Sequence, residues 1–403
     1  MRIRRIILNN FRNYGRLELD VGPSVNIIYG DNGEGKTNLI ESIFVGSCIT
    51  SHKTNKDSKL VKIGENSYSI ELIMEDDDGS EITLKDDVLL VNETPKRSMY
   101  CNNARITKIS DYMGICNTVI FAPEDLNIIK GSPVERRKFL NLMISKVSPT
   151  YVNLIANTNR VLNQKNETLK NSRNSDNVEQ QLDFWDYSLC DLMAELIIHR
   201  YRYVRILDDI AADYHLSISS NKEKLKLKYC TISGCIELIE RFLDDNSTTD
   251  ALLSGGLNRT DFEALKAILS SHILNKLKSS RKYDLEKGIS SVSIKKDDID
   301  ILLNDKQTRV YSSQGQQRSA ALSLKLAELA IIKRFSGSTP ILLLDDVFSE
   351  LDVNRRVSLI SAISDTQLFI TCTDRGYIEQ EMASFIHDRN DVRYFNVKDG
   401  TVS

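Results

Sequence analysis

The chain has 403 residues, of which 41% are hydrophobic and 27% charged, and its formal net charge at pH 7 is -3. This length suits two or three globular domains, and the charge excludes a global positive field that would draw the whole molecule onto nucleic acid or an anionic membrane. The seven cysteines form no Cys-x-x-Cys pair, and no long apolar run could span a membrane. We therefore expect a cytoplasmic protein with reduced thiols.

Near the N-terminus, apolar runs at residues 3–8 and 25–29 predict strands, and the second leads directly into a glycine-rich loop. The loop fits G-x-x-x-x-G-K-[ST] and is followed by a helical pattern, as a phosphate-binding loop requires. Its backbone N–H groups would wrap phosphates, Lys36 would reach the terminal phosphates and Thr37 would ligate Mg²⁺. The residues expected to bind Mg-ATP are Gly30, Asp31, Asn32, Gly33, Glu34, Gly35, Lys36, Thr37 and Asn38.

Farther along, alternating apolar runs at residues 69–73 and 81–84 flank an Asp78-Gly79 turn, which predicts a hairpin and an antiparallel layer. The character changes to helix after residue 126, with a helix start at Ser132 and Pro133. Residues 148–214 read as two long helices broken near residues 171–177, and residues 222–228 alternate as a strand does. The middle of the chain is therefore predicted to be a mainly helical lobe or arm.

An apolar strand at residues 341–344 ends in Asp345 and Asp346. Acids at the carboxyl end of a buried strand lie where open α/β sheets bind ligands. Asp345 would hold Mg²⁺, and Asp346 would orient and deprotonate the attacking water. The distance in sequence from Lys36 implies a large insertion. We expect an α/β fold whose ATPase head comes from residues 1–125 and 286–403, with residues 126–285 as the inserted lobe.

Residues 312–317, Ser-Ser-Gln-Gly-Gln-Gln, precede a helical run at residues 318–335. Ser313 and Gln316 have the spacing of a capping box, so on the simplest interpretation they only start that helix. The segment also resembles the signature motif of the ABC-type ATPases, and residues 349–352 resemble their D-loop. That resemblance implies an ATP-dependent homodimer in which the partner's nucleotide is contacted in trans by Ser313, Gln314, Gly315 and Gln316.

More closely, the chain resembles the RecF family of bacterial recombinational repair proteins, over residues 1 to about 375. The blocks that carry the resemblance are residues 10–14 (NFRNY), 35–41 (GKTNLIE), 121–126 (FAPEDL), 130–133 (KGSP) with Arg136 and Arg137, and 314–318 (QGQQR). The resemblance implies slow, DNA-stimulated ATP hydrolysis that acts as a switch. It also places Arg12 beside the nucleotide, Glu124 at the Q-loop as a catalytic-site residue, and Thr371 where ABC proteins carry a switch histidine.

The same resemblance implies partners and a task. Members bind DNA at gaps, with a preference for junctions of single- and double-stranded DNA, and work with RecO and RecR to place RecA. They support DNA replication and SOS induction, and they associate with the nucleoid. One block departs from the family, because Gly-Pro-His-Arg-Asp-Asp is replaced here by residues 293–298, Ser-Ile-Lys-Lys-Asp-Asp. A divergent paralogue with another DNA-related task therefore stays open as an alternative.

Three consecutive basic residues at a helix start, Arg136, Arg137 and Lys138, are candidate DNA phosphate contacts. Further candidates lie at residues 222–228 and at Lys276, Lys278, Arg281 and Lys282, although such runs are commonly just solvated faces. The sequence has no helix-turn-helix or zinc-finger spacing that would indicate readout of DNA bases. The five histidines show no metal-ligand spacing, so Mg²⁺ is the only metal that the sequence implies.

The sequence argues against two other classes of ABC-type protein. A transporter motor would have a compact head and a short gap between phosphate loop and signature, which the inserted lobe argues against. A long-armed tether of the SMC type would need heptads sustained over hundreds of residues, and the arm predicted here is too short.

Overall fold

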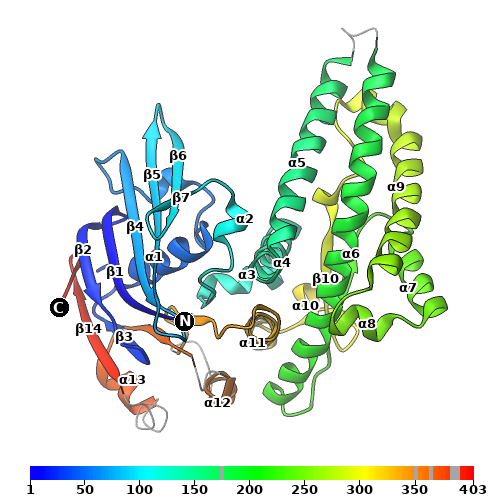
Figure 1. Cartoon of the computed structure of the whole chain (residues 1–403). Coiled ribbons are helices and arrows are strands. Elements are labelled where there is room, and N and C mark those ends of the chain that lie inside the picture. The colour runs from blue at the N-terminus through cyan, green and yellow to red at the C-terminus, as the bar shows by residue number, and fades with distance from the viewer. Residues whose placement is uncertain (173–176, 349–352, 363–365, 382–390) are drawn as a thin grey trace. The chain divides into compact units, whose positions relative to one another are not determined.

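The computed structural model describes residues 1–172, 177–348, 353–362, 366–381 and 391–403 of the chain. It divides into two compact units, whose elements are labelled in Figure 1. Residues 1–126, 217–220 and 318–403 form the head unit, and residues 127–216 and 221–317 form the arm unit. The expected domain division at residues 125 and 285 stays a prediction, and residues 286–317 belong with the arm unit in the structure.

The central sheet of the head unit interleaves strands from both ends of the chain, in the order β15, β14, β3, β13, β12 and β8. β14 through β8 pair in parallel, and β15 pairs antiparallel with β14. The strands are β3 (Val25–Tyr29), β8 (Thr118–Phe121), β12 (Ile341–Leu344), β13 (Leu368–Cys372), β14 (Val392–Lys398) and β15 (Thr401–Val402). The carboxyl ends of β3, β12 and β13 consequently meet at one edge, where open α/β sheets bind ligands.

A second, antiparallel sheet of the head unit has the order β2, β1, β4, β5, β6 and β7. The expected hairpin at Asp78 and Gly79 is confirmed, because β4 and β5 pair on either side of it with Glu75 opposite Glu81. Buried and partly exposed residues alternate along β4, as a sheet with one face on the core requires. The strands are β1 (Arg2–Phe11), β2 (Tyr14–Asp20), β4 (Ser67–Glu75), β5 (Glu81–Val91), β6 (Thr94–Cys101) and β7 (Ala104–Ile106).

Helix α1 (Lys36–Cys48) packs against strands of both sheets and is buried along most of its length. Gly46 permits the close approach, because a Cβ there would come within 2.8 Å of the Ile70 side chain. The hydroxyl of Tyr112 donates a hydrogen bond to Gly46 O at 2.5 Å. The other helical segments of the head are η1 (Asp57–Lys59), α2 (Ile109–Tyr112), η2 (Pro123–Asp125), most of α11 (Gln314–Ser336), α12 (Val353–Ala362) and α13 (Arg375–Glu381).

The arm unit is mainly helical, and its two long helices α5 (Pro149–Lys170) and α6 (Val178–Ile218) break where the sequence predicts. Its small antiparallel sheet has the order β11, β10 and β9. The elements are α3 (Leu126–Lys130), α4 (Pro133–Val147), β9 (Leu225–Cys230), α7 (Cys235–Asn246), α8 (Thr249–Ser254), α9 (Arg259–Lys287), η4 (Ile294–Lys296), β10 (Asp298–Leu303), β11 (Lys306–Gln307) and α10 (Thr308–Tyr311). Throughout the described ranges, every helix falls short of the length and hydropathy needed to cross a bilayer.

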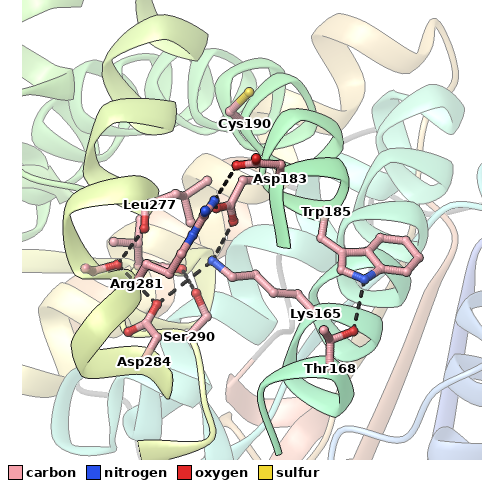
Figure 2. Close-up of polar contacts among 12 residues, drawn as sticks. Lys165, Thr168, Asp183, Trp185, Cys190, Leu277, Arg281, Asp284 and Ser290 are labelled. Atoms are coloured by element: carbon pink, nitrogen blue, oxygen red, sulfur yellow. Dashed lines mark hydrogen bonds and ion pairs between the residues drawn. The ribbon is translucent and has the colours of Figure 1, made fainter. Parts of the chain in front are cut away.

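Buried ion pairs join three helices of the arm unit, as Figure 2 shows. Lys165 of α5 is 2% exposed, and its Nζ lies 2.7 Å from Asp186 Oδ1 on α6 and 3.9 Å from Asp284 Oδ2 on α9. Arg281 of α9 extends the network to Asp186 and Asp183 at 2.8 Å and 2.7 Å. The guanidinium of Arg281, a candidate DNA contact by sequence, is therefore engaged within the arm.

The segment at residues 293–298, expected from the sequence to depart from the family pattern, supplies two acids that brace the arm unit internally. Asp297 is 2% exposed and accepts hydrogen bonds from the buried guanidinium of Arg200 and from Tyr229 OH, the latter at 2.5 Å. Asp298 receives both Nε and Nη2 of Arg136, at 2.6 Å and 2.9 Å. Burial raises the pKa of Asp297 above its ordinary value, against the favourable field of Arg200. The two acids thus hold Arg200 and Arg136 in place within the arm unit.

Candidate nucleotide site

The loop between β3 and α1 turns through glycines at positive φ, namely Gly30, Gly33 and Gly35 at 147°, 90° and 119°. Residues with a Cβ rarely adopt these angles. A Cβ would in addition lie 2.3 Å from Val397 O at Gly30 and 2.4 Å from Asn13 Nδ2 at Gly35, whereas at Gly33 it would meet nothing within 4 Å. Gly30 and Gly35 therefore allow the loop to pack on the head, and Gly33 faces open space.

Lys36 opens α1 and is 8% exposed. Its Nζ donates hydrogen bonds to Gly30 O and Asp31 O, both at 2.7 Å, so the ammonium lies across the loop. Backbone N–H groups at a helix N-terminus carry partial positive charge, and here they adjoin a lysine ammonium. The neighbouring residues Asp31, Asn32 and Gly33 are exposed, so the loop offers these cationic groups to a ligand in the way a polyphosphate site requires.

The turn between β1 and β2 holds the loop through side-chain hydrogen bonds. Asn13 Nδ2 donates to Glu34 O at 3.0 Å, and Asn38 Nδ2 donates to Asn13 Oδ1 at 2.8 Å. The hydroxyl of Tyr14 donates to Gly35 O at 3.0 Å. Burial raises the pKa of Tyr14, so this hydroxyl stays protonated and remains a donor. Asn38 therefore acts on the loop through Asn13 in this structure, and its contact with nucleotide stays a prediction.

The two acids after β12 meet the phosphate loop and β13 through hydroxyl groups. Thr37 Oγ1 and Thr371 Oγ1 both donate to Asp345 Oδ1, at 2.8 Å and 2.9 Å. Thr371 Oγ1 also accepts from the backbone N–H of Asp346 at 2.9 Å. Asp345 is buried, whereas Asp346 is exposed with a φ of 53°. Three segments widely separated in sequence thus converge on one carboxylate, and the residue beside it is turned to the surface.

These residues fit a magnesium-bound nucleotide. A carboxylate and a threonine hydroxyl are hard oxygen ligands of the kind Mg²⁺ takes alongside water and phosphate oxygens. Asp345 and Thr37 bring them together beside the ammonium of Lys36, which would be a phosphate partner. The donor set therefore suits Mg²⁺ on one side and phosphate on the other.

Arg12 lies near this site, but its guanidinium is held by a neighbouring acid. Its Nε and Nη2 donate to the two oxygens of Glu41 at 2.8 Å and 2.9 Å, and the Arg12 side chain is 22% exposed. Ser51 Oγ donates to the same carboxylate at 2.5 Å, and its oxygen accepts from Lys53 N at 2.9 Å. The structure thus assigns Arg12 to a chain of contacts that shapes the loop after α1, while a nucleotide contact stays a prediction.

Lys53 is a site residue that the sequence motifs did not indicate. Its Nζ lies 3.7 Å from Asp345 Oδ2 and 3.7 Å from Glu124 Oε1. One lysine side chain therefore lies close to both Glu124, which is expected at the Q-loop position, and Asp345 at the end of β12. The Ser-x-x-Thr turn at residues 51–54 was the available signal, because such turns fix short loops, but it does not say which carboxylates the lysine will face.

The signature segment, residues 312–317, lies in the arm unit and opens α11. The capping box is confirmed, because Ser313 N donates to Gln316 Oε1 at 2.8 Å and Gln316 N donates to Ser313 Oγ at 3.3 Å. Ser313 and Gln314 are exposed, and Gly315 and Gln316 are half-buried. The D-loop prediction at residues 349–352 falls outside the described residues.

The basic residues at the start of α4 are largely committed to the arm unit itself. Arg136 is 6% exposed and bound by Asp298, and Arg137 Nη1 donates to Asp297 O at 2.7 Å. Burial lowers the pKa of Lys138. A DNA phosphate contact at these three positions stays a prediction, and Arg136 would have to leave a bidentate carboxylate to make one.

Comparison with known proteins extends the likeness over the whole chain. Residues 2–392 match the model of the RecF/RecN/SMC N terminal domain family. A DNA replication and repair protein RecF of Clostridium tetani is 35% identical over 400 residues, covering 99% of each chain. Its counterpart in Ruminiclostridium cellulolyticum is 34% identical over 378 residues, covering 94% of each.

Solved structures agree with these relatives. A structure of the recombination mediator protein RecF with ATP, in the RecFOR pathway, superposes with a TM-score of 0.83 at 31% identity, covering 100% of this chain and 97% of that one. An SMC head bound to the C-terminal winged-helix domain of ScpA has a TM-score of 0.50 at 14% identity, covering 100% of this chain and 97% of that chain, which supports the fold alone. The expected fold class is confirmed, an ABC-type ATPase head with an inserted helical region.

Proposed function

Because the chain belongs to the RecF family of DNA replication and repair proteins, we propose that it is a DNA-binding ATPase of recombinational repair that uses Mg-ATP to close a homodimer. The observation that carries the proposal is the junction of Thr37, Asp345 and Thr371, which joins the phosphate loop to the ends of β12 and β13. The RecF structure with ATP supports the same nucleotide.

Within one subunit, the loop at residues 30–37 would bind the phosphates, with Lys36 at the terminal ones. Thr37 and Asp345 would hold Mg²⁺, which supplies charge neutralisation of the transferred phosphoryl group when bound. Asp346, exposed beside the buried Asp345, would orient and deprotonate the attacking water. Glu124 and Lys53 would line the same edge of the sheet.

Closure would bring the signature segment of one subunit to the nucleotide of the other. Ser313 and Gln314 are exposed at the start of α11, where a second copy could be reached. A γ-phosphate then provides the contacts that favour the closed dimer over the open one, and ADP lacks them. Slow hydrolysis would reset the switch.

The DNA task follows from membership in the RecF family. We propose binding at gaps with single- and double-stranded junctions, cooperation with RecO and RecR to load RecA, and DNA-stimulated hydrolysis. The family's role in DNA replication and SOS induction, and association with the nucleoid, are part of the same proposal. Its support is the full-length similarity to RecF proteins and to the RecF structure of the RecFOR pathway.

Sedimentation of the Asp346→Asn variant in Mg²⁺ tests the switch. Blocking hydrolysis accumulates whichever state the γ-phosphate favours, so we expect a dimer with ATP and a monomer with ADP. Ser313→Arg is the matched variant, and it should bind ATP and remain monomeric. Dimerisation of Ser313→Arg to the same extent as the parent would contradict the trans-acting signature.

The divergent segment at residues 293–298 motivates the second candidate, a RecF paralogue with another DNA task. Its two acids brace Arg136 and Arg200 inside the arm unit, which is compatible with either candidate. Complementation of a strain without its own RecF discriminates the two. Failure to complement, combined with normal ATP-dependent dimerisation, would favour the paralogue.

A further inference from the structure

The signature segment is anchored by a residue remote from it in sequence. Gln316 Nε2 donates a hydrogen bond to Glu223 Oε1 at 2.8 Å, between the start of α11 and the segment that precedes β9. The other half of the same amide, Gln316 Oε1, accepts from Ser313 N at 2.8 Å. All three residues belong to the arm unit. The amide of Gln316 is therefore used on both sides, once for the capping box and once for Glu223.

A buried histidine contacts the other oxygen of the Glu223 carboxylate. His215, in the last turn of α6, is 0% exposed, and its Nε2 lies 3.1 Å from Glu223 Oε2. At this distance an imidazole N–H donates to a carboxylate oxygen. Glu223 is itself only 20% exposed, and both of its oxygens have partners. The carboxylate is thus fixed between α6 and the signature segment.

This arrangement selects one orientation of the Gln316 amide. If the amide were turned over, its oxygen would face the Glu223 carboxylate, and its NH₂ group would face the Ser313 N–H. Both contacts would be repulsive. Hydrogen bonds to a charged acceptor are stronger than those between neutral groups, so Glu223 is the dominant constraint on this side chain. Through Gln316 it also fixes the backbone at Ser313.

We propose that Glu223, supported by His215, is a positioning residue for the signature segment: it holds Gln316, and thereby Ser313, in the conformation that a second copy of the chain must meet when ATP closes the dimer. The inference rests on the proposed function, because the signature matters only if it acts on the partner's nucleotide. Glu223 itself touches no nucleotide in this scheme. Its loss should consequently affect closure and leave nucleotide binding by each subunit intact.

The test compares substitutions in the Asp346→Asn background by sedimentation with ATP, together with ATP affinity measured at protein concentrations where the subunits stay monomeric. Glu223→Met keeps the length of the side chain but replaces the carboxylate with a thioether, which is only a weak acceptor, whereas Glu223→Gln retains an oxygen acceptor for Gln316. Asp213→Asn, at an exposed position of α6 two residues before His215, is the control. Gln316→Ala removes the same bond from the other side, and its combination with Glu223→Met completes a double-mutant cycle.

We expect Glu223→Met to raise the dimer dissociation constant about tenfold, as loss of a hydrogen bond to a charged group does. ATP affinity of the monomer should not change. Glu223→Gln, which keeps the acceptor but loses its charge, should lie between Glu223→Met and the parent, and Asp213→Asn should dimerise within about twofold of the parent, a difference below one ordinary hydrogen bond. In the cycle, Glu223→Met should add little to Gln316→Ala. Additive effects, or normal dimerisation of Glu223→Met, would overturn the inference while the proposed function stands. If Ser313→Arg dimerises normally as well, the proposed function itself fails.

Discussion

At the residue scale, Thr371 ties the two acids after β12 together, and its substitution separates binding from hydrolysis. Thr371→Val keeps the shape but removes the hydroxyl that donates to Asp345 and accepts from Asp346 N–H. We expect hydrolysis to fall about tenfold, because one hydrogen bond that positions the acids is worth about 1.4 kcal/mol. ATP affinity should change little, and Thr371→Ser should restore turnover. Single-turnover hydrolysis and equilibrium ATP binding measure the two effects, and unchanged turnover in Thr371→Val would argue against this role.

Asp86, buried in the antiparallel sheet of the head, should make stability depend on pH. Its Oδ1 lies 3.1 Å from Arg97 Nε, and Tyr68 OH donates to its Oδ2 at 3.2 Å. Burial outweighs Arg97 and raises the pKa of Asp86 from 3.8 to about 6. Between about pH 4 and pH 6 the folded state therefore binds more protons than the unfolded state, so stability falls as the pH rises through that window.

The shift corresponds to about 3 kcal/mol, since each pKa unit is about 1.4 kcal/mol. Asp86→Asn should remove this part of the pH dependence, as measured by urea unfolding at several pH values from 4 to 7. The control is Asp87→Asn, whose side chain is 32% exposed. The same slope in Asp86→Asn as in the parent would show that another group is responsible.

At the element scale, the buried ion pairs determine how α5, α6 and α9 stay together. Lys165→Met would leave Asp186 and Asp284, both 0% exposed, without their common lysine. Removing one member of a buried pair costs about 3–5 kcal/mol. The chain's one tryptophan, Trp185 on α6, donates to Thr168 Oγ1 of α5 at 3.1 Å and reports unfolding of this region. Its fluorescence should show a lower urea midpoint for Lys165→Met, whereas the exposed Lys170→Met should match the parent.

The elements themselves were largely predictable, because each depends on local pattern. The hairpin at Asp78, the helix start at Pro133 and the strand β9 all carry short-range signals of turn, cap or alternation. The contacts between elements that are remote in sequence could not be predicted in this way. Gly400 N donates to Glu34 O at 3.1 Å, so the hairpin of β14 and β15 supports the phosphate loop across most of the chain. No sequence pattern near Glu34 predicts its contact with Gly400.

At the scale of the whole molecule, the candidate nucleotide site was the more predictable part because the chemistry of such sites demands fixed spacings and strand ends. The phosphate-loop motif and the strand before Asp345 predict that the two segments meet, and the hydrogen bond from Thr37 to Asp345 shows that they do. Nucleotide binding by these residues stays a prediction. For the basic residues the pattern shows charge but not the acids that neutralise it. Arg136 is an example, because its partner Asp298 lies 162 residues away in the sequence.

The affinity of the protein for DNA should depend on salt more steeply when ATP is bound. Each chain carries a formal charge of -3, so affinity for DNA must come from local basic surfaces, and closing a dimer on DNA would double the number that can engage. Because the slope of log affinity against log salt scales with the phosphates neutralised, it should be about twice as steep with ATP as with ADP. Lys36→Arg preserves charge but should impair the response to ATP. For this variant the salt dependence of DNA affinity should therefore have the same slope with ATP as with ADP. Fluorescence anisotropy on a gapped duplex over a range of salt measures them. Equal slopes for the parent chain in ATP and ADP would mean that closure does not combine two DNA-binding surfaces.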